Sequence, residues 1–217
     1  MSKKEIAKRY IMFIFCLFFM GIGVALTKHG ELGISPVSSV ANVISCKFTF
    51  ISFGTWLTIS NCMMVLVQIL LLRRNFKPIQ LLQIPLSFLF GYFTDLGSWL
   101  VAGIPNDIYV VRILLVLGGV VVIAFGICLG IIANVMLNSG EAMVKAIADV
   151  TKKDFGTVKV IFDVSWVTLS VILSLIFFNG KLIGTREGTL IAAVTLGFVV
   201  KFIKPLIDKP LTKLLTK

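Results

Sequence analysis

The sequence contains few charged residues. They make up 14% of its 217 positions, against about a quarter in soluble domains, whereas hydrophobic residues make up 58%. A chain with so little charge cannot cover a water-exposed surface, so the composition predicts an integral membrane protein and excludes a soluble globular enzyme. The apolar runs leave no stretch for a separate soluble domain, and we expect one membrane domain over residues 1–217.

Histidine and paired cysteines are scarce too. The sequence has one histidine, His29, and none of its four cysteines forms a CxxC pair, which excludes a histidine metal cluster and argues against a disulfide framework. The chain also has no HExxH motif, and no GxSxG motif with a matching His and Asp. We therefore expect neither an enzyme nor a bound cofactor or metal.

Acidic residues are outnumbered: 10 Asp and Glu stand against 21 Lys and Arg, which gives a net charge of +11. With the N-terminus inside, 16 of these cations fall in inner segments and five in outer ones. Because Lys and Arg collect in cytoplasmic loops, this bias predicts that both termini are cytoplasmic in a bacterial plasma membrane. The basic excess therefore reflects topology and lipid contact, and no nucleic-acid partner is expected.

Long apolar runs dominate the chain. Their length and lack of strict alternation favour helices over barrel strands. After the last run, residues 204–217 form a basic cytoplasmic tail, read either as a short interfacial helix or as a frayed end. The six predicted membrane spans are Tyr10–Leu26, Phe53–Leu72, Ile79–Ala102, Tyr109–Ala133, Val158–Phe178 and Gly188–Ile203.

The two halves of the chain resemble each other. Residues 52–55 read Ser-Phe-Gly-Thr, and residues 154–157, an offset of 102, read Asp-Phe-Gly-Thr. Three spans per copy is an odd number, so the second copy must insert upside down, which gives two inverted repeats over residues 10–102 and 109–203. Further matches place Asn61 on Asp163 and Gln68 on Ser170 at the same offset, Gly21 on Gly126 at an offset of 105, and Gln80 on Arg186 at 106.

Each copy also carries a short helix, over residues 35–46 and 139–150. Both are too short to span a bilayer, so each either lies in the interface or enters the membrane as a re-entrant half-helix. The first has Ser35 before Pro36, a good helix start. In the second, Glu141, Lys145 and Asp149 are four residues apart and form one charged face, which favours an interfacial position.

Short glycine-rich motifs link the chain to a known group. Together they resemble the YczE/YyaS/YitT group of bacterial multi-pass membrane proteins, the YczE-like branch most closely. The resemblance implies a six-span permease of the plasma membrane, with no assigned substrate and no catalytic residue to carry over. The motifs that carry it are Gly21–Ala25, Leu32–Pro36, Ser52–Thr55, Gly91–Asp95 and Gly184–Thr189.

Polar side chains within the spans are the candidates for substrate binding, because such groups usually face protein or a water-filled path. Asp163 is the strongest, and its alternative role is a structural ion pair with Lys159 or Arg186. The predicted set, expected to surround one cavity, is Asn61, Gln68, Gln83, Asp163, Ser170 and Arg186.

These features favour a small secondary transporter, or permease, for a small polar solute. The cation at Arg186 and a half-helix beginning at Ser35 favour a solute with an anionic group. The alternatives are a substrate-binding membrane subunit of a multi-component ATP-driven uptake system and a non-transporting regulatory protein. The small-xxx-small motifs Gly21–Ala25 and Gly126–Gly130 bring the first and fourth spans together, or else form a homodimer face.

Overall fold

A computed structural model describes residues 3–216, apart from the side chains at positions 187, 190, 191 and 216. Every element in this range is a helix, which confirms the predicted all-α class. Two short 3₁₀ turns, η1 (Arg73–Asn75) and η2 (Pro78–Leu82), connect the third and fourth helices. The α-helices are α1 (Lys3–His29), α2 (Pro36–Lys47), α3 (Phe53–Leu72), α4 (Gln83–Val101), α5 (Tyr109–Ala133), α6 (Ser139–Thr151), α7 (Phe155–Phe177) and α8 (Glu187–Thr216).

Side-chain caps fix where the matching helices α3 and α7 begin. The Ser52 side chain accepts a hydrogen bond from the Thr55 backbone N–H, and the Asp154 side chain accepts one from the Thr157 N–H. Each cap satisfies a donor that the first helical turn leaves without a partner. The duplicated Phe-Gly-Thr motif therefore encodes the same helix start twice.

Five helices of the described chain are long and apolar enough to cross a membrane: α1, α3, α4, α5 and α7, with α3 and α4 extended by their 3₁₀ turns. The sixth predicted span lies within α8, which is not among these five. The tail is neither frayed nor a separate helix, because α8 continues through Pro205 and Pro210 to Thr216. Lys217, the last residue of the predicted tail, lies outside the described residues.

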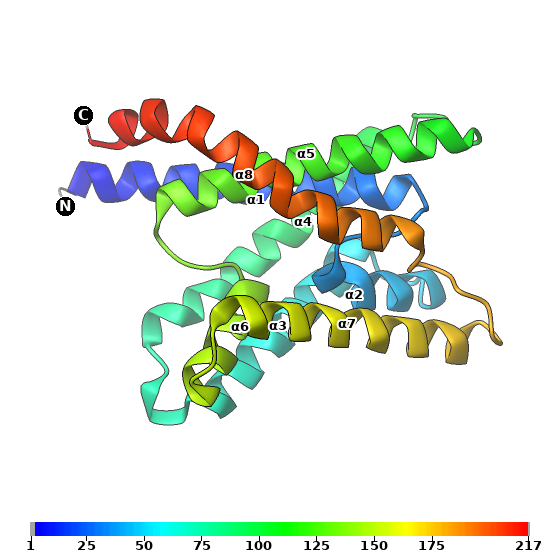
Figure 1. Ribbon diagram of the computed structural model, residues 1–217, viewed down its shortest axis with the longest axis horizontal. Coiled ribbons are helices and arrows are strands. Elements are labelled where there is room, and N and C mark those ends of the chain that lie inside the picture. Colours follow the sequence, from blue (N-terminus) through cyan, green and yellow to red (C-terminus); the bar gives the residue numbers. More distant parts are fainter. Residues whose placement is uncertain (1–2, 217) are drawn as a thin grey trace.

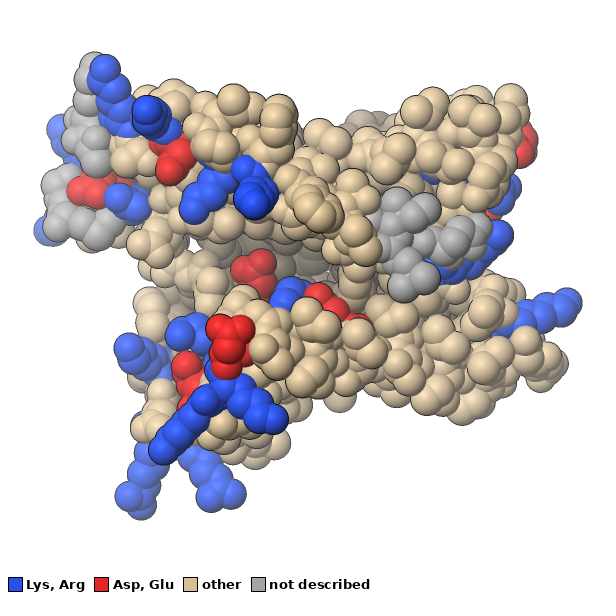
Figure 2. All heavy atoms as spheres, in the orientation of Figure 1, with Lys and Arg blue, Asp and Glu red and all other residues tan. Residues whose placement is uncertain are grey.

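The helices form two groups (Figure 1). One contains α1, α5 and α8, with α5 packed against both others, and the second contains α2, α3, α6 and α7. Helix α4 joins the groups because it packs against both α1 and α3. No comparable contact joins α7 to α8 among the described residues, and the space-filling view shows a hollow there (Figure 2).

Glycines let α1 and α5 cross closely. A Cβ on Gly119 would lie 2.7 Å from the Gly23 carbonyl oxygen, and one on Gly126 would lie 2.9 Å from the Cys16 oxygen. The prediction that these two spans meet is confirmed. The motif predicted to form this contact on α1, Gly21 with Ala25, does not face α5. Gly21 and its companion face α4 instead, where a Cβ on Gly21 would lie 2.9 Å from the Thr94 nitrogen.

The two short helices meet at their N-terminal ends. A Cβ on Gly140, in the first turn of α6, would lie 2.8 Å from a methyl group of Val37 in the first turn of α2. Helix α2 packs against α7, and α6 packs against α3, so each short helix lies on a long helix of the other half. Their buried residues include Val43 and Val144, each with 0% of its surface exposed.

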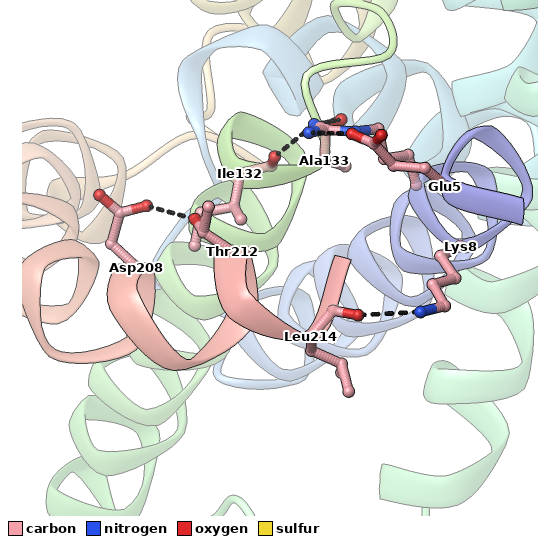
Figure 3. A network of polar contacts seen from close by, with 8 residues as sticks. Glu5, Lys8, Ile132, Ala133, Asp208, Thr212 and Leu214 are labelled. Atoms are coloured by element: carbon pink, nitrogen blue, oxygen red, sulfur yellow. Dashed lines mark hydrogen bonds and ion pairs between the residues drawn. The ribbon is translucent and has the colours of Figure 1, made fainter. Parts of the chain in front are cut away.

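Two basic side chains of α1 tie the start of the chain to the ends of α5 and α8 (Figure 3). The Arg9 guanidinium donates to the Ala133 carbonyl oxygen at 3.0 Å and pairs with Glu5 at 3.0 Å. The Lys8 ammonium donates to the Leu214 carbonyl oxygen at 3.1 Å. The N- and C-termini consequently lie side by side at one end of the molecule (Figure 1).

Candidate functional site

A cavity of 680 Å³ opens at the end of the molecule opposite the termini, which is within the size range of small-molecule sites. Helices α1 and α4 end at this cavity, α3 begins there, and the segment before α8 closes one side. We name it the large cavity. It is lined by Ala25, Lys28, His29, Glu31, Gly33, Asn42, Cys46, Ser52, Phe53, Asp95, Ser98, Val101, Leu182, Ile183, Gly184 and Arg186.

Lys28 contributes a cation with only neutral contacts. Its ammonium donates to the Ser45 hydroxyl at 3.2 Å and lies 3.9 Å from the centre of the Phe53 ring, a cation–π contact. No ion pair joins Lys28 to another of the residues described. Asp95 of the same cavity acts on this charge from a longer distance, but it forms no ion pair with Lys28, so an anion in the cavity could make a charge-assisted contact with the ammonium.

The carboxylates of the large cavity already have partners. Asp95 accepts hydrogen bonds from the Ser52 hydroxyl and, at 2.8 Å, from the Gly54 backbone N–H at the start of α3. Glu31 pairs with Arg112 at 3.4 Å. The Asp95 carboxylate thus stabilises the start of α3, and Glu31 pairs with Arg112. The Lys28 ammonium forms no such pair with a described residue.

Helix α2 forms the wall that connects this cavity to the segment before α8. The Asn42 amide donates to the Gly184 carbonyl oxygen at 2.7 Å, and Gly184 adopts a φ of +81° that favours glycine. One turn further along α2, Cys46 also lines the cavity. Burial raises the pKa of the Cys46 thiol, with a smaller opposing effect from the Lys28 charge.

A second cavity, of 230 Å³, lies near the other end of the molecule between α1, α5 and the start of α6. We name it the small cavity, and Glu141 is its only charged lining residue among those described. Burial raises the pKa of Glu141, while Lys159 opposes this shift and Asp163 adds to it. It is lined by Phe13, Cys16, Met20, Ile127, Gly130, Ile131, Asn134, Val135, Met136, Leu137, Asn138 and Glu141.

The predicted site residues do not surround one cavity. Arg186 lines the large cavity, whereas Asp163 forms the alternative ion pair with Lys159, at 2.7 Å. Buried Asn61 has a side-chain nitrogen without a hydrogen-bond partner in the described structure. Gln68 and Gln83 bond to each other at 3.2 and 3.3 Å, and Ser170 bonds to Thr185 at 2.9 Å.

Sequence reasoning missed two of the charged groups that line cavities. Lys28 was counted only as an outer positive charge, although its place at the end of a long apolar run was a usable signal. Glu141 is predicted from the sequence to share one charged face with Lys145 and Asp149. Lys145 and Asp149 are indeed exposed and pair at 3.6 Å, but Glu141 is turned toward the small cavity. The neighbouring Gly140, which permits a close helix contact, was the available signal.

The helices and cavities define a class of protein: an all-helical membrane protein with at least five helices long and apolar enough to span the bilayer and two cavities that contain charged side chains. The chain belongs to a family described as "Family of unknown function (DUF6198)", which it matches over residues 7–205. No curated protein and no solved structure matches it. The YczE/YyaS/YitT resemblance gains no support from these comparisons, and it stays a prediction.

Proposed function

We propose that the protein is a small secondary transporter that carries a small polar solute with an anionic group across a bacterial plasma membrane. The observation that carries this proposal is the large cavity, where Lys28 forms no ion pair with another described residue and Arg186 adds a second cation. A cavity of 680 Å³ is large enough for a small metabolite.

The proposed membrane arrangement has six spans, with α8 as the sixth. Both termini lie at the same end of the molecule, which requires an even number of crossings (Figure 1). The charge bias supports a cytoplasmic position for this end, and in this arrangement the large cavity faces outward. A solute would enter the large cavity from the outside and leave toward the cytoplasm.

The proposed inverted repeat, residues 10–102 and 109–203, is supported by contacts that recur at a constant spacing. Ser170 and Thr185 form a hydrogen-bonded pair, and each follows its counterpart in the Gln68–Gln83 pair by 102 positions. The offset of 106 proposed between the third and sixth spans would not match these pairs. Transporters built from such repeats hold their substrate between the two copies.

A second set of contacts supports the same offset. The Ser87 hydroxyl bonds to Ser139 at 3.2 Å, next to the start of α6. Thr189 follows Ser87 by 102 positions, and its hydroxyl accepts from the Ile34 N–H at 3.2 Å, next to the start of α2. The last helix of each half thus holds the start of the short helix of the other half.

The short helices act as re-entrant half-helices in this proposal. Their first turns meet at Val37 and Gly140, between the two cavities, rather than lying on a surface. A helix of 12 residues reaches about 18 Å, about half of a bilayer. Asn42 and Cys46 on α2 would then contact the solute from within the membrane.

The test is a thermal-shift screen of the purified, full-length protein against a panel of small carboxylates, phosphates and neutral polar metabolites. We expect an anionic solute to stabilise the parent protein. Lys28→Met and Arg186→Gln should each weaken that binding by about tenfold or more, because each removes a charge-assisted contact.

Matched variants complete the test. Lys181→Gln removes an exposed cation just before α8 and should bind as the parent does. Asp163→Asn tests the intramembrane site predicted from the sequence. This variant should bind as the parent does if the solute occupies the large cavity. A solute that stabilises the parent, Lys28→Met and Arg186→Gln equally would overturn the assignment of the large cavity. Uptake into proteoliposomes only after addition of an ATPase complex would favour the uptake-subunit alternative.

A further inference from the structure

Glu141 occupies an unusual position for a carboxylate in so apolar a chain. It lies in the first turn of α6, which begins at Ser139, and its side chain lines the small cavity. At about 30 Å³ for each water molecule in the liquid, a cavity of 230 Å³ has room for several waters. The small cavity therefore has room for water beside this carboxylate, which is the first requirement for exchanging a proton.

The carboxylate has no fixed partner. Neither a hydrogen bond nor an ion pair joins the Glu141 side chain to another residue of the described chain. The two nearby lysines are engaged elsewhere, since Lys159 pairs with Asp163 at 2.7 Å and Lys145 pairs with Asp149 at 3.6 Å. Glu141 is thus free to change its charge without breaking a contact.

The charged and titratable groups around Glu141 come from the neighbouring helices. Lys159 and Asp163 on α7 act on it with opposite signs, and Cys16 on α1 faces the same cavity. Helix α3, which packs against α6, carries no charged side chain. The positive end of α6 favours the ionised carboxylate, whereas its enclosed position favours the neutral acid. Opposing influences of this kind hold a group ready to titrate.

We propose that Glu141 is a proton-binding site, reached through the small cavity, that couples proton movement to solute transport. This inference rests on the proposed transport function. A proton from water in the small cavity binds one carboxylate oxygen and makes Glu141 neutral, and release of that proton to water restores the negative charge. The Lys159–Asp163 pair is internally neutral and stays intact in both states.

A structural path joins this site to the large cavity. Gly140, next to Glu141, contacts Val37 in the first turn of α2. Further along the same helix, Asn42 and Cys46 line the large cavity. A shift of α6 when Glu141 gains or loses charge would therefore move α2, which forms a wall of the solute site.

The test measures the melting temperature of the purified protein in nanodiscs from about pH 5 to pH 8, and the probe is the proton alone. Because Glu141 has a raised pKa in the folded protein, the folded state binds more protons than the unfolded chain above the ordinary value of 4.5. Stability should therefore fall as the pH rises through this window. Glu141→Gln should flatten this fall, whereas Asp149→Asn, an exposed neighbour on α6, should keep it.

Asp163→Asn provides a second, directional variant. Removal of this negative charge should lower the pKa of Glu141 and move the pH transition to lower pH. If Glu141→Gln does not fold, infrared spectroscopy of the parent and of Asp163→Asn replaces it, and the protonated-carboxyl band should disappear at lower pH in the variant.

An unchanged pH dependence in Glu141→Gln, or an unmoved transition in Asp163→Asn, overturns the proposal. These measurements need no solute, so their failure is distinguishable from a failure of the large-cavity assignment.

Discussion

At the residue scale, the few charged side chains inside this apolar chain have separable tasks. Asp95 is committed to structure, because both of its oxygens accept hydrogen bonds at the start of α3. The Lys28 ammonium, in the same cavity, donates to a hydroxyl and lies over an aromatic ring. The same cavity therefore contains one charge that organises the fold and one that forms no ion pair with a described residue and that we propose binds the solute.

Asp95→Asn should destabilise the protein, because the substitution removes the negative charge that faces the first turn of α3. A helix-start contact of this kind is worth about 1 kcal/mol. We expect a lower melting temperature in detergent for Asp95→Asn, with no change for Asp107→Asn in an exposed loop. Equal melting temperatures for both variants would show that Asp95 does not stabilise α3.

At the element scale, α1 and α5 can cross closely because glycines, which have no side chain, lie at their contact. Gly119 lies against the Gly23 carbonyl oxygen and Thr27, and Gly23 lies against Ile123. Hydrophobic driving force is weak between helices in lipid, so close backbone approach supplies much of the association energy. A single added methyl group at this crossing must push the helices apart.

Two adjacent glycines of α5 provide a matched comparison. A Cβ at Gly119 would lie 2.7 Å from the Gly23 oxygen, whereas one at Gly118 would meet nothing within 4 Å. Gly119→Ala should therefore cost about 1–3 kcal/mol through overpacking. Gly118→Ala should be neutral or slightly stabilising, because alanine is the better helix former. Melting temperatures of the two purified variants test this, and similar losses in both would contradict the crossing geometry.

At the scale of the whole molecule, the two chain ends meet. Lys8 on α1 reaches the Leu214 carbonyl oxygen near the end of α8, and Arg9 reaches the end of α5 (Figure 3). These contacts place several basic residues at one end of the molecule. A cluster of basic residues of this kind suits the cytoplasmic leaflet, where anionic lipids attract Lys and Arg.

Reporter fusions test the orientation. Fusions after Arg74 and at the C-terminus should both report a cytoplasmic position, and a fusion after Asp107 should report an external one, because cations concentrate in the two former segments. A C-terminal fusion that reports an external position would contradict the six-span arrangement and would reverse the assignment of α8.

Much of the helical pattern followed from the sequence. The predicted bounds of α3 and α5 agree with the structure at both ends, because polar or turn-forming residues flank apolar runs there. The end of α8 was less predictable. Pro205 and Pro210 are typical helix breakers, yet the helix continues through both of them.

The candidate site was only partly predictable. Arg186 was placed at a cavity, and Asp163 was given Lys159 as its alternative partner, because i, i+4 neighbours on a helix necessarily meet. The Gln68–Gln83 pair was not foreseen, since helical periodicity identifies a polar face but not the residue opposite it.

The sequence by itself determined that this is a helical membrane protein, because composition and run length act locally and leave few alternatives in lipid. It also determined the starts of α3 and α7, which depend on the capping residues Ser52 and Asp154 beside them. Only the tertiary structure decided which polar groups satisfy each other and which line a cavity. Glu141 and Asp149 belong to one charged face in the sequence, yet only Glu141 lines the small cavity, because α6 rests on α3 and α7 and meets α2 at Gly140.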